Sequence, residues 1–161
     1  MTTFKRVLTD EMTAAIKALI PRYPSKQAVT LPALHVVNDC LRHVPLPAVV
    51  EIADLLDLAP AQVQDTLTFY GFFKQDKPHG EVRAWVCRSI SCHLRDADGL
   101  LKHMCEKAGI RPGETTANGK LTLEFGECLG ACEHAPCMLA GDTLHKSVTT
   151  EQADEFLEKL K

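Results

Sequence analysis

Two pairs of cysteines constrain this 161-residue chain more than any other feature of its sequence. Cys87 and Cys92 flank four residues in "CRSISC", and Cys128 and Cys132 flank three in "CLGAC". No apolar run approaches the length of a membrane span, and the N-terminal "MTTFKRVLTDEM" lacks the apolar core of a signal peptide. We therefore expect a reducing compartment, where seven cysteines serve metal or redox chemistry more often than disulfides.

Both cysteine pairs follow segments whose alternating pattern predicts a β-strand. "EVRAWVC" ends at Cys87, and "LTLEF" comes shortly before Cys128. Each pair is therefore expected on a loop, and the two loops can leave the same edge of one sheet. A [2Fe–2S] cluster needs four thiolates, two for each iron, and two such loops can supply them.

Other metal sites and redox chemistries fit the pattern less well. Structural zinc also uses pairs of cysteines separated by two to four residues, so zinc stays open, although both spacings here are wide. The sequence contains no C-x-x-C motif, which argues against a thioredoxin-type dithiol oxidoreductase. A Rieske centre needs two histidines, but four cysteines already complete a ligand set. We interpret His93 and His134, each next to a proposed ligand, as surface residues or neighbours of the ligands.

The other three cysteines are predicted to pack rather than to bind metal. Cys40 is expected on the apolar side of a helix, and Cys105 in the middle of another helix. Cys137, five residues after Cys132, is interpreted as an apolar position that opens a strand. The alternative is that Cys137 replaces Cys132 as a ligand.

Up to about residue 73 the apolar residues recur with a helical period. Leu34, Val37, Leu41 and Val44 form one such stripe, and Thr30 is a predicted N-cap. Prolines mark the helix boundaries, including Pro21 and Pro24 after the first helix and Pro47 and Pro60 at the starts of the third and fourth. The sequence predicts a bundle of four short helices, at residues 10–20, 31–44, 47–58 and 60–73.

The polar segment "KQDKPHG", residues 74–80, predicts a boundary between domains at 1–78 and 79–161. Beyond it, a helix is expected at 96–110, two short strands within 137–148, and a last helix at 150–161 capped by Thr149 or Thr150. This β-α-β-β-α order is the compact thioredoxin-like layout. The predicted fold class is thus α+β, with an N-terminal helical bundle followed by a thioredoxin-like domain.

The net charge of −3 gives neither half the basic surface that nucleic acid requires. The segment "EIADLLDLAPAQVQDTL" has the rhythm of a helix-turn-helix, with Ala53 and Val63 inside. An iron–sulfur transcription regulator is therefore an alternative. Residues 59–73 contain no Lys or Arg, so we expect no nucleic-acid partner. The aromatic residues of "TFYGFF" are expected to face the interior of the protein and a partner surface.

Four motifs together resemble one family: "TFYGFF", "VCRSISC", "GKLTLEFGECLGACEHAP" and "VTTEQADEFLEKL". The chain is similar to the small [2Fe–2S] subunit of NADH:quinone oxidoreductase (complex I), the E or 24-kDa type, from about residue 10 to residue 161. It is also similar to gamma-type subunits of NAD-linked formate dehydrogenases and hydrogenases. The family usually has an apolar residue after "AP", where this chain has Cys137.

The resemblance implies that Cys87, Cys92, Cys128 and Cys132 hold a [2Fe–2S] cluster in a thioredoxin-like ferredoxin domain. It implies an electron-transfer subunit without a substrate site, beside a flavoprotein that binds FMN and oxidises NADH, with the cluster off the main electron chain. The expected location is the cytoplasm, on the inner face of a membrane through the complex, or an organelle matrix. The chain itself lacks the Gly-rich fingerprint of a dinucleotide site.

Glutamates near the third and fourth proposed ligands suggest a further hypothesis about the cluster. Glu124, Glu127 and Glu133 place negative charge there. Negative charge disfavours the more negative reduced state, so we expect a low reduction potential.

Overall fold

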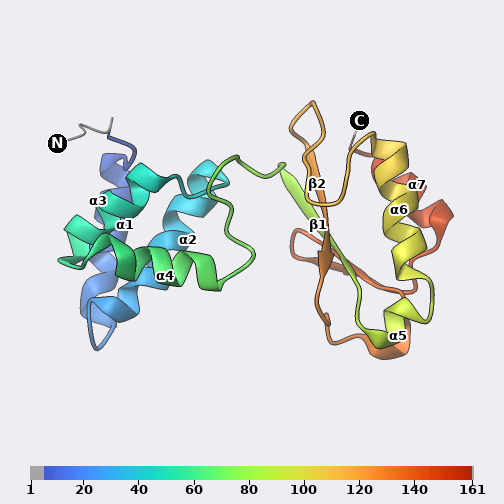
Figure 1. Ribbon diagram of the computed structural model, residues 1–161, viewed down its shortest axis with the longest axis horizontal. Helices are drawn as coiled ribbons and strands as arrows, with labels where there is room; N and C mark the ends of the chain where they lie inside the picture. The colour runs from blue at the N-terminus through green and yellow to red at the C-terminus, as the bar shows by residue number, and fades with distance from the viewer. Residues whose placement is uncertain (1–5, 161) are drawn as a thin grey trace. The chain divides into compact units, whose positions relative to one another are not determined.

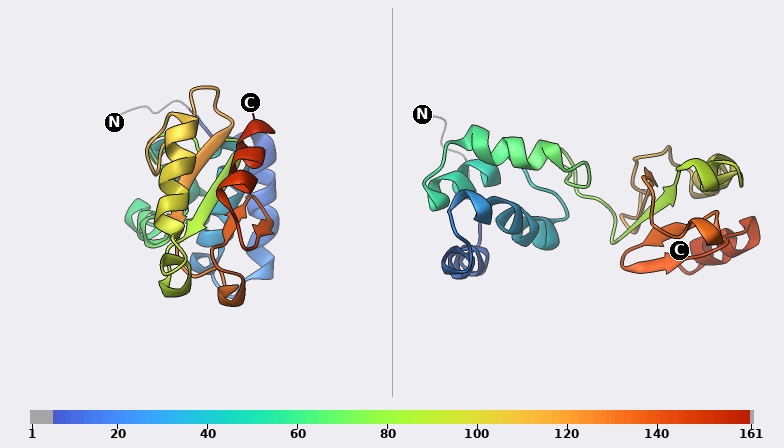
Figure 2. Two further views of the ribbon diagram at one scale, coloured as in Figure 1. Left: turned by 90° about the vertical axis from the view of Figure 1, so that its right-hand side faces the viewer. Right: turned by 90° about the horizontal axis from the view of Figure 1, so that it is seen from below.

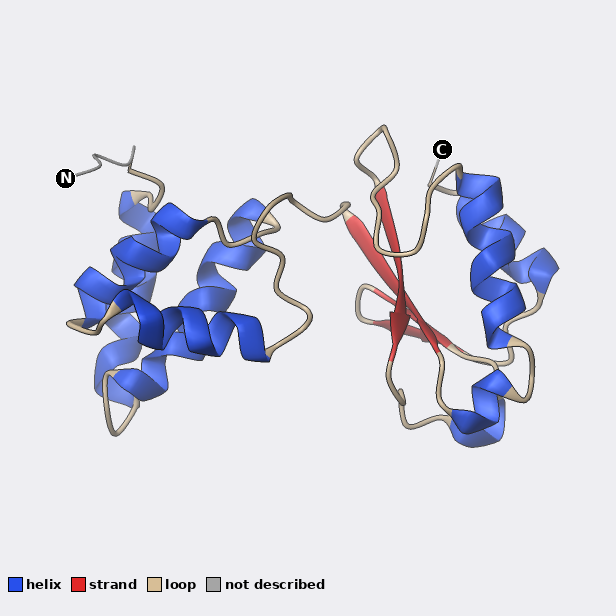
Figure 3. Cartoon of the chain, viewed as in Figure 1, coloured by secondary structure: helices blue, strands red, loops and turns tan. Residues whose placement is uncertain are grey.

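The computed structural model describes residues 6–160, and the chain divides into two compact units, Met1–Pro78 and His79–Lys161. Figure 3 shows that the described strands all belong to the second unit, whereas the first is built from helices and loops. Each unit has its own apolar core. No helix among residues 6–160 has both the length and the apolar composition needed to cross a bilayer.

The first unit is the predicted helical bundle. Its α-helices are α1 (Asp10–Leu19), α2 (Thr30–Leu41), α3 (Leu46–Leu56) and α4 (Pro60–Phe69), with one-turn 3₁₀ helices at Ile20–Arg22 and Gln27–Val29. Ile16, Leu34 and Ile52 contribute completely buried side chains from three of these helices. Pro60 begins α4 as predicted, because a first-turn residue needs no backbone N–H donor.

Two predictions about α2 are wrong. Thr30 does not cap the helix: the 3₁₀ turn ending at Val29 runs directly into α2, so no extended residue precedes the helix. The hydroxyl of Thr30 is instead buried without a hydrogen-bond partner within the described part of the chain. Cys40 is exposed rather than buried, because it lies in the last turn of α2, at the flank of the stripe that contains Leu34 and Val37.

The aromatic segment after α4 divides between the interior and the surface. Phe73 is buried, whereas Phe69 is 80% exposed. Phe72 stacks on the ring of His35, with ring centroids 5.4 Å apart. The interior part of the prediction is therefore confirmed for Phe73, and Phe69 presents its ring to the outside.

The second unit is a four-stranded sheet covered by helices on one face. The strands are β1 (Val82–Cys87), β2 (Leu121–Gly126), β3 (Met138–Ala140) and β4 (Thr143–His145), in the order β2-β1-β3-β4 among the described residues. A short helix α5 (Ile90–His93) leads to α6 (Ala97–Ala108), and α7 (Thr150–Glu158) ends the fold. Figures 1 and 2 show α6 and α7 side by side over the sheet. The predicted α+β class and thioredoxin-like domain are confirmed. The order of strands and main helices is β-α-β-β-β-α, one strand more than the expected β-α-β-β-α.

The alternation of β1 explains which face the helices cover. Ala84 and Val86 point to the apolar core, where they join Leu101 and Met104 of α6. Thr149 caps α7 as predicted, since its hydroxyl accepts a hydrogen bond from the amide of Gln152.

Strand direction determines where the cysteines lie. β1 runs parallel to β2 and antiparallel to β3. The C-terminal ends of β1 and β2 and the N-terminal end of β3 therefore lie at the same edge of the sheet. Cys87 and Cys137, which are far apart in the sequence, meet at this edge.

Candidate metal centre

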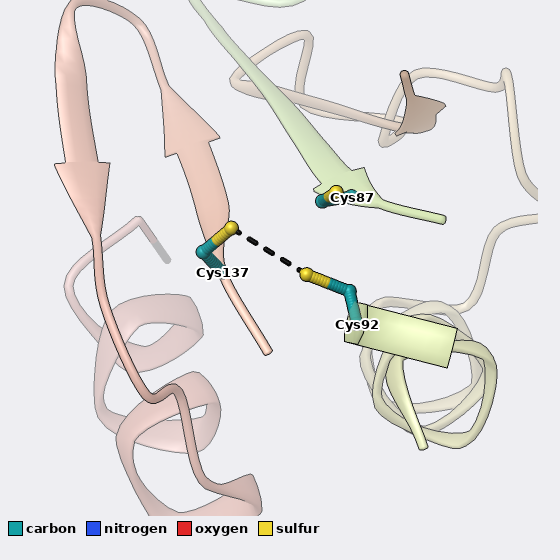
Figure 4. Close-up of side chains that lie close together, drawn as sticks. All are labelled: Cys87, Cys92 and Cys137. Atoms are coloured by element: carbon teal, nitrogen blue, oxygen red, sulfur yellow. Dashed lines mark hydrogen bonds between the residues drawn. The ribbon is translucent and has the colours of Figure 1, made fainter. Parts of the chain in front are cut away.

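Three thiols converge where β1, α5 and β3 meet. Cys87 is the last residue of β1, Cys92 lies in α5, and Cys137 immediately precedes β3. Their Sγ atoms all lie within 4.8 Å of one another, and each side chain is buried. Figure 4 shows the sulfurs of Cys92 and Cys137 facing each other, with Cys87 at the end of β1 beside them, and the Cys92–Cys137 sulfur distance is 3.6 Å. We call these residues the buried thiol trio.

Two further thiols follow β2: Cys128 lies on the loop after the strand, and Cys132 begins the 3₁₀ helix η3 (Cys132–His134). The Sγ atoms of Cys128 and Cys132 are 3.7 Å apart, and both residues are exposed. Between them Gly130 has a φ of 74°, a conformation that L side chains rarely adopt, and this lets the short loop fold back on itself. We call Cys128 and Cys132 the exposed thiol pair.

The trio and the pair are neighbours at one site. The backbone amide of Leu129, inside the second loop, helps to lower the pKa of the Cys87 thiol, which places this loop beside Cys87. Cys128 in turn has the largest effect on the pKa of the Cys132 thiol, which is also lowered by the Ser91 hydroxyl of α5 and raised by the charge of Cys92. The segments after β1 and β2, together with the residue before β3, therefore bring five thiols to one edge of the sheet.

The surroundings of Cys87 lower the pKa of its thiol, whereas those of Cys92 raise the pKa of its thiol. Burial by itself raises a thiol pKa, yet the pKa of Cys87 is lowered, because the amides of Ser89 and Leu129 donate hydrogen bonds to its sulfur. The pKa of Cys92 is raised, first by burial and further by the neighbouring Cys87, although the amide of Cys137 partly offsets this. Hydrogen bonds thus prepare Cys87 to be a thiolate.

The pKa values of the other two contacting thiols rise for different reasons. Burial raises the pKa of Cys137 to about 12, and the adjacent Cys92 contributes further. Cys132 is exposed, and its pKa is raised chiefly by Cys128, whose sulfur competes with it for negative charge. Thiols crowded in this way favour a cation among them, because a metal ion stabilises several thiolates at once.

The structure brings together the members of each predicted pair, Cys87 with Cys92 and Cys128 with Cys132. Two local details of the prediction are wrong: Cys92 lies in the short helix α5, and Cys132 begins the 3₁₀ helix η3, whereas both were expected on loops. The structure also adds Cys137, which the sequence indicated chiefly as a packing residue. It is buried as expected, but its sulfur contacts another thiol. The sequence held one signal for this, because the resemblance implied an apolar residue where this chain has Cys137.

These sulfur positions fit a tetrahedral metal–thiolate site. Two thiolates on one tetrahedral ion, with metal–sulfur bonds of about 2.3 Å, lie roughly 3.8 Å apart. The Cys92–Cys137 and Cys128–Cys132 distances, 3.6 and 3.7 Å, are close to this value. With two sulfur groups side by side, the donor set suits a centre of two metal ions and fits a [2Fe–2S] cluster.

The predicted negative environment needs correction. Glu124 is buried in an ion pair with Arg83 at 2.5 Å, because strand alternation directs both side chains to the face opposite the helices. Glu127 pairs with Arg88 on the surface, so positive charge opposes both carboxylates. Arginines therefore offset the negative charge of two of the three glutamates on which the hypothesis of a low reduction potential was based.

The two histidines lie at the surface, as predicted. His93 contacts Asp98 at 2.8 Å, and its side chain is 61% exposed. His134 lies 3.8 Å from Glu133. Neither belongs to the group of side chains that could hold a metal among the described residues.

The comparison with family models matches residues 16–161 to the thioredoxin-like [2Fe–2S] ferredoxin. One curated relative is the E 2 subunit of NADH-quinone oxidoreductase from Rhizobium meliloti (strain 1021). It is 37% identical over 150 residues, covering 93% of this chain and 89% of that protein. The E-type subunit of NADH-quinone oxidoreductase from Aquifex aeolicus (strain VF5) is 32% identical over 151 residues, covering 93% of each chain.

Solved structures share the fold. An NAD⁺-reducing [NiFe]-hydrogenase in the H₂-reduced state matches with a TM-score of 0.70 and 24% sequence identity, over 81% of this chain. The match spans 22% of the hydrogenase chain, so the present chain corresponds to about a fifth of it.

Proposed function

The chain belongs to the thioredoxin-like [2Fe–2S] ferredoxin family, and on this basis we propose that it is an electron-transfer subunit of an NADH:quinone oxidoreductase. The observation that carries this proposal is the clustering of thiols from two loops at one sheet edge. Curated relatives named as E-type subunits of that enzyme match over almost their whole length, which supports the same assignment.

We assign the cluster to Cys87, Cys92, Cys128 and Cys132. A bound [2Fe–2S] cluster supplies one-electron chemistry, taking up and returning a single electron. The chain's own residues control that exchange. The amides of Ser89 and Leu129 donate to the sulfur of Cys87 and favour the state with more negative charge, while burial of Cys92 excludes water from one side of the site.

The partners follow from what the chain itself lacks in its sequence. It has no Gly-rich strand–loop–helix fingerprint for a dinucleotide, so we assign FMN and NADH to a flavoprotein subunit beside it. In this assignment the chain has no substrate site of its own and works inside a larger dehydrogenase complex. We place that complex in the cytoplasm, at the inner face of a membrane, or in an organelle matrix.

The first experiment is to measure iron, acid-labile sulfide and zinc per chain, on protein purified without air. We expect about two irons and two sulfides, the content of one [2Fe–2S] cluster. One zinc without sulfide would overturn the electron-transfer function and leave the thiols a structural role. Co-purification with an FMN-containing subunit, followed by reduction of the cluster signal with NADH, tests the assignment to the complex.

A second candidate is the equivalent [2Fe–2S] subunit of an NAD-linked hydrogenase or formate dehydrogenase. The structural likeness to the NAD⁺-reducing [NiFe]-hydrogenase favours it, although at 24% identity that likeness shows the fold alone. Identification of the co-purified subunits separates the two candidates, because only the first would bring quinone-reducing subunits.

A further inference from the structure

The edge of the sheet carries one thiol more than a [2Fe–2S] cluster requires. Four thiolates complete the cluster, and Cys87, Cys92, Cys128 and Cys132 supply them. The fifth thiol, that of Cys137, lies as close to Cys92 as Cys128 lies to Cys132: the sulfur–sulfur distances are 3.6 and 3.7 Å. Cys137 thus has the spacing of a ligand without a place in the assigned set.

The backbone holds Cys137 in this position. The amide of Cys87 donates to the carbonyl of Cys137 at 3.0 Å, which extends the β1–β3 pairing to the thiols. The sulfur of Cys137 in turn contacts that of Cys92. The side chain is 1% exposed. A strand that pairs directly with β1 therefore fixes this thiol, whereas Cys128 and Cys132 lie on an exposed loop.

We propose that Cys137 is a reserve ligand, able to take the place of Cys92 on the iron that Cys87 and Cys92 share. This inference rests on the proposed function, because it needs the cluster to be present. The position of Cys137, five residues after Cys132 in the sequence, suggested that it could replace Cys132. The geometry points to Cys92 instead, whose sulfur Cys137 contacts.

The exchange is a ligand substitution without electron transfer. With a cluster bound, the Cys92 sulfur would release its iron and the Cys137 sulfur would bind that iron in its place. The Cys137 thiol gives its proton to the departing Cys92 thiolate, so charge and atoms balance. At a separation of 3.6 Å the proton needs no intervening residue. When residue 92 carries no thiol, the proton of Cys137 passes to solvent as the cluster is assembled.

The test compares single and double variants of the full chain, reconstituted with iron and sulfide without air. The readouts are iron and sulfide per chain and the visible circular dichroism of the cluster. We expect Cys92→Ala to keep most of its iron, with a changed dichroism spectrum. The double variant Cys92→Ala/Cys137→Ala should lose about tenfold or more. Cys137→Ala should keep its iron, because the assigned four ligands remain.

Cys132→Ala is the matched control. It also lacks one ligand and retains Cys137, but the Cys137 sulfur contacts Cys92 and cannot replace Cys132. We expect it to lose iron as completely as the double variant. Equal loss in Cys92→Ala and in the double variant would overturn the proposal, and so would retention of the cluster in Cys132→Ala. A wild-type chain without iron and sulfide would instead overturn the proposed function, so the two failures are distinguishable.

A parallel variant protects the test against misfolding. Cys92→Ser preserves the size of the side chain, and far-ultraviolet circular dichroism reports whether each variant folds. We expect Cys92→Ser to keep the absorption spectrum of a cluster bound by four sulfurs, because Cys137 replaces the lost thiolate. A spectrum in Cys92→Ser that is unaffected by adding Cys137→Ala would contradict the proposal.

Discussion

The buried thiol trio and the exposed thiol pair are built by different means. Strand pairing and the core place Cys87, Cys92 and Cys137, whereas Cys128 and Cys132 depend on a short loop with a left-handed glycine between them. The trio is sealed from solvent and the pair is open to it. This contrast indicates that the buried and the exposed side of the site have different roles. The sealed side fixes ligand geometry and sulfur hydrogen bonds, and the open side is where a redox partner can approach.

The largest effect is expected from removal of one exposed ligand. Cys128→Ala should reduce bound iron and sulfide to about a tenth or less, since the pair is then incomplete and the fifth thiol, Cys137, is directed at Cys92 instead. Metal and sulfide analysis after anaerobic reconstitution measures this. Cys40→Ala is the matched control, because Cys40 is an exposed cysteine of the other unit. If Cys128→Ala were as well loaded as Cys40→Ala, the pair would not be part of the site.

The next effect concerns the sheet that carries both thiol groups. Glu124→Gln should lower the free energy of unfolding by about 3–5 kcal/mol, because it leaves the buried guanidinium of Arg83 without its carboxylate. The chain has one tryptophan, Trp85, whose ring lies 4.7 Å from the Arg83 guanidinium carbon, so its fluorescence reports denaturation. The double variant Arg83→Met/Glu124→Leu should lose much less. A loss in Glu124→Gln below about 1 kcal/mol would show that the pair is solvated.

A direct measure of the contrast between trio and pair is thiol alkylation in the metal-free chain. Iodoacetamide should modify Cys128 and Cys132 about tenfold or more faster than the trio, whose reaction must wait for local opening of the core. Peptide mass spectrometry over time resolves the two groups. Comparable rates at all five thiols would remove the distinction between a sealed and an open side.

The smallest effect should come from the ion pairs between α6 and α7. Asp154 contacts Lys107 at 2.5 Å and His103 at 2.8 Å, and these partners hold the pKa of Asp154 below its ordinary value of 3.8. A lowered pKa means that the contribution to stability is present above about pH 4 and is lost as the pH falls through the folded-state pKa.

Asp154→Asn should therefore lower Tm at neutral pH by less than Glu124→Gln does, and the difference from wild type should vanish in acid. Because α7 covers the core that seals the trio, alkylation of the trio should quicken while that of the exposed pair stays the same. Glu155→Gln, an exposed change on the same helix, is the control. A Tm difference that is constant with pH would assign the effect to packing rather than to charge.

Local patterns in the sequence predicted most of the fold, because they act over short distances. The alternation of "EVRAWVC" is that of a strand half-covered by helices, and Thr149 with Gln152 forms a cap within one turn. The prediction that Thr30 caps α2 failed because the residues before it form a 3₁₀ turn. That turn depends on packing rather than on residue type. The prediction that Cys40 is buried failed because the apolar stripe of a helix does not show where the neighbouring helices stop covering that helix.

Only the part of the thiol site that depends on the spacing of cysteines along the sequence could be predicted. Cys87 with Cys92 and Cys128 with Cys132 follow from short separations after strands. The contact of Cys137 with Cys92 depends on the antiparallel pairing of β3 with β1, which a single sequence does not reveal. The same applies to Glu124: nearness to Cys128 in the sequence suggested a shared environment, but alternation turns its carboxylate to Arg83.

The pairing of Cys137 with β1 also bears on how the protein matures. The exposed pair can gather its two thiols within a single loop, before the rest of the unit is in place. The trio exists only after the chain around Cys137 has docked against the end of β1, a contact between distant parts of the sequence. Contact between the sulfurs of Cys137 and Cys92 therefore requires that β3 has already paired with β1. The reserve ligand is thus the last of the five thiols to reach the site, because it alone depends on pairing between distant strands.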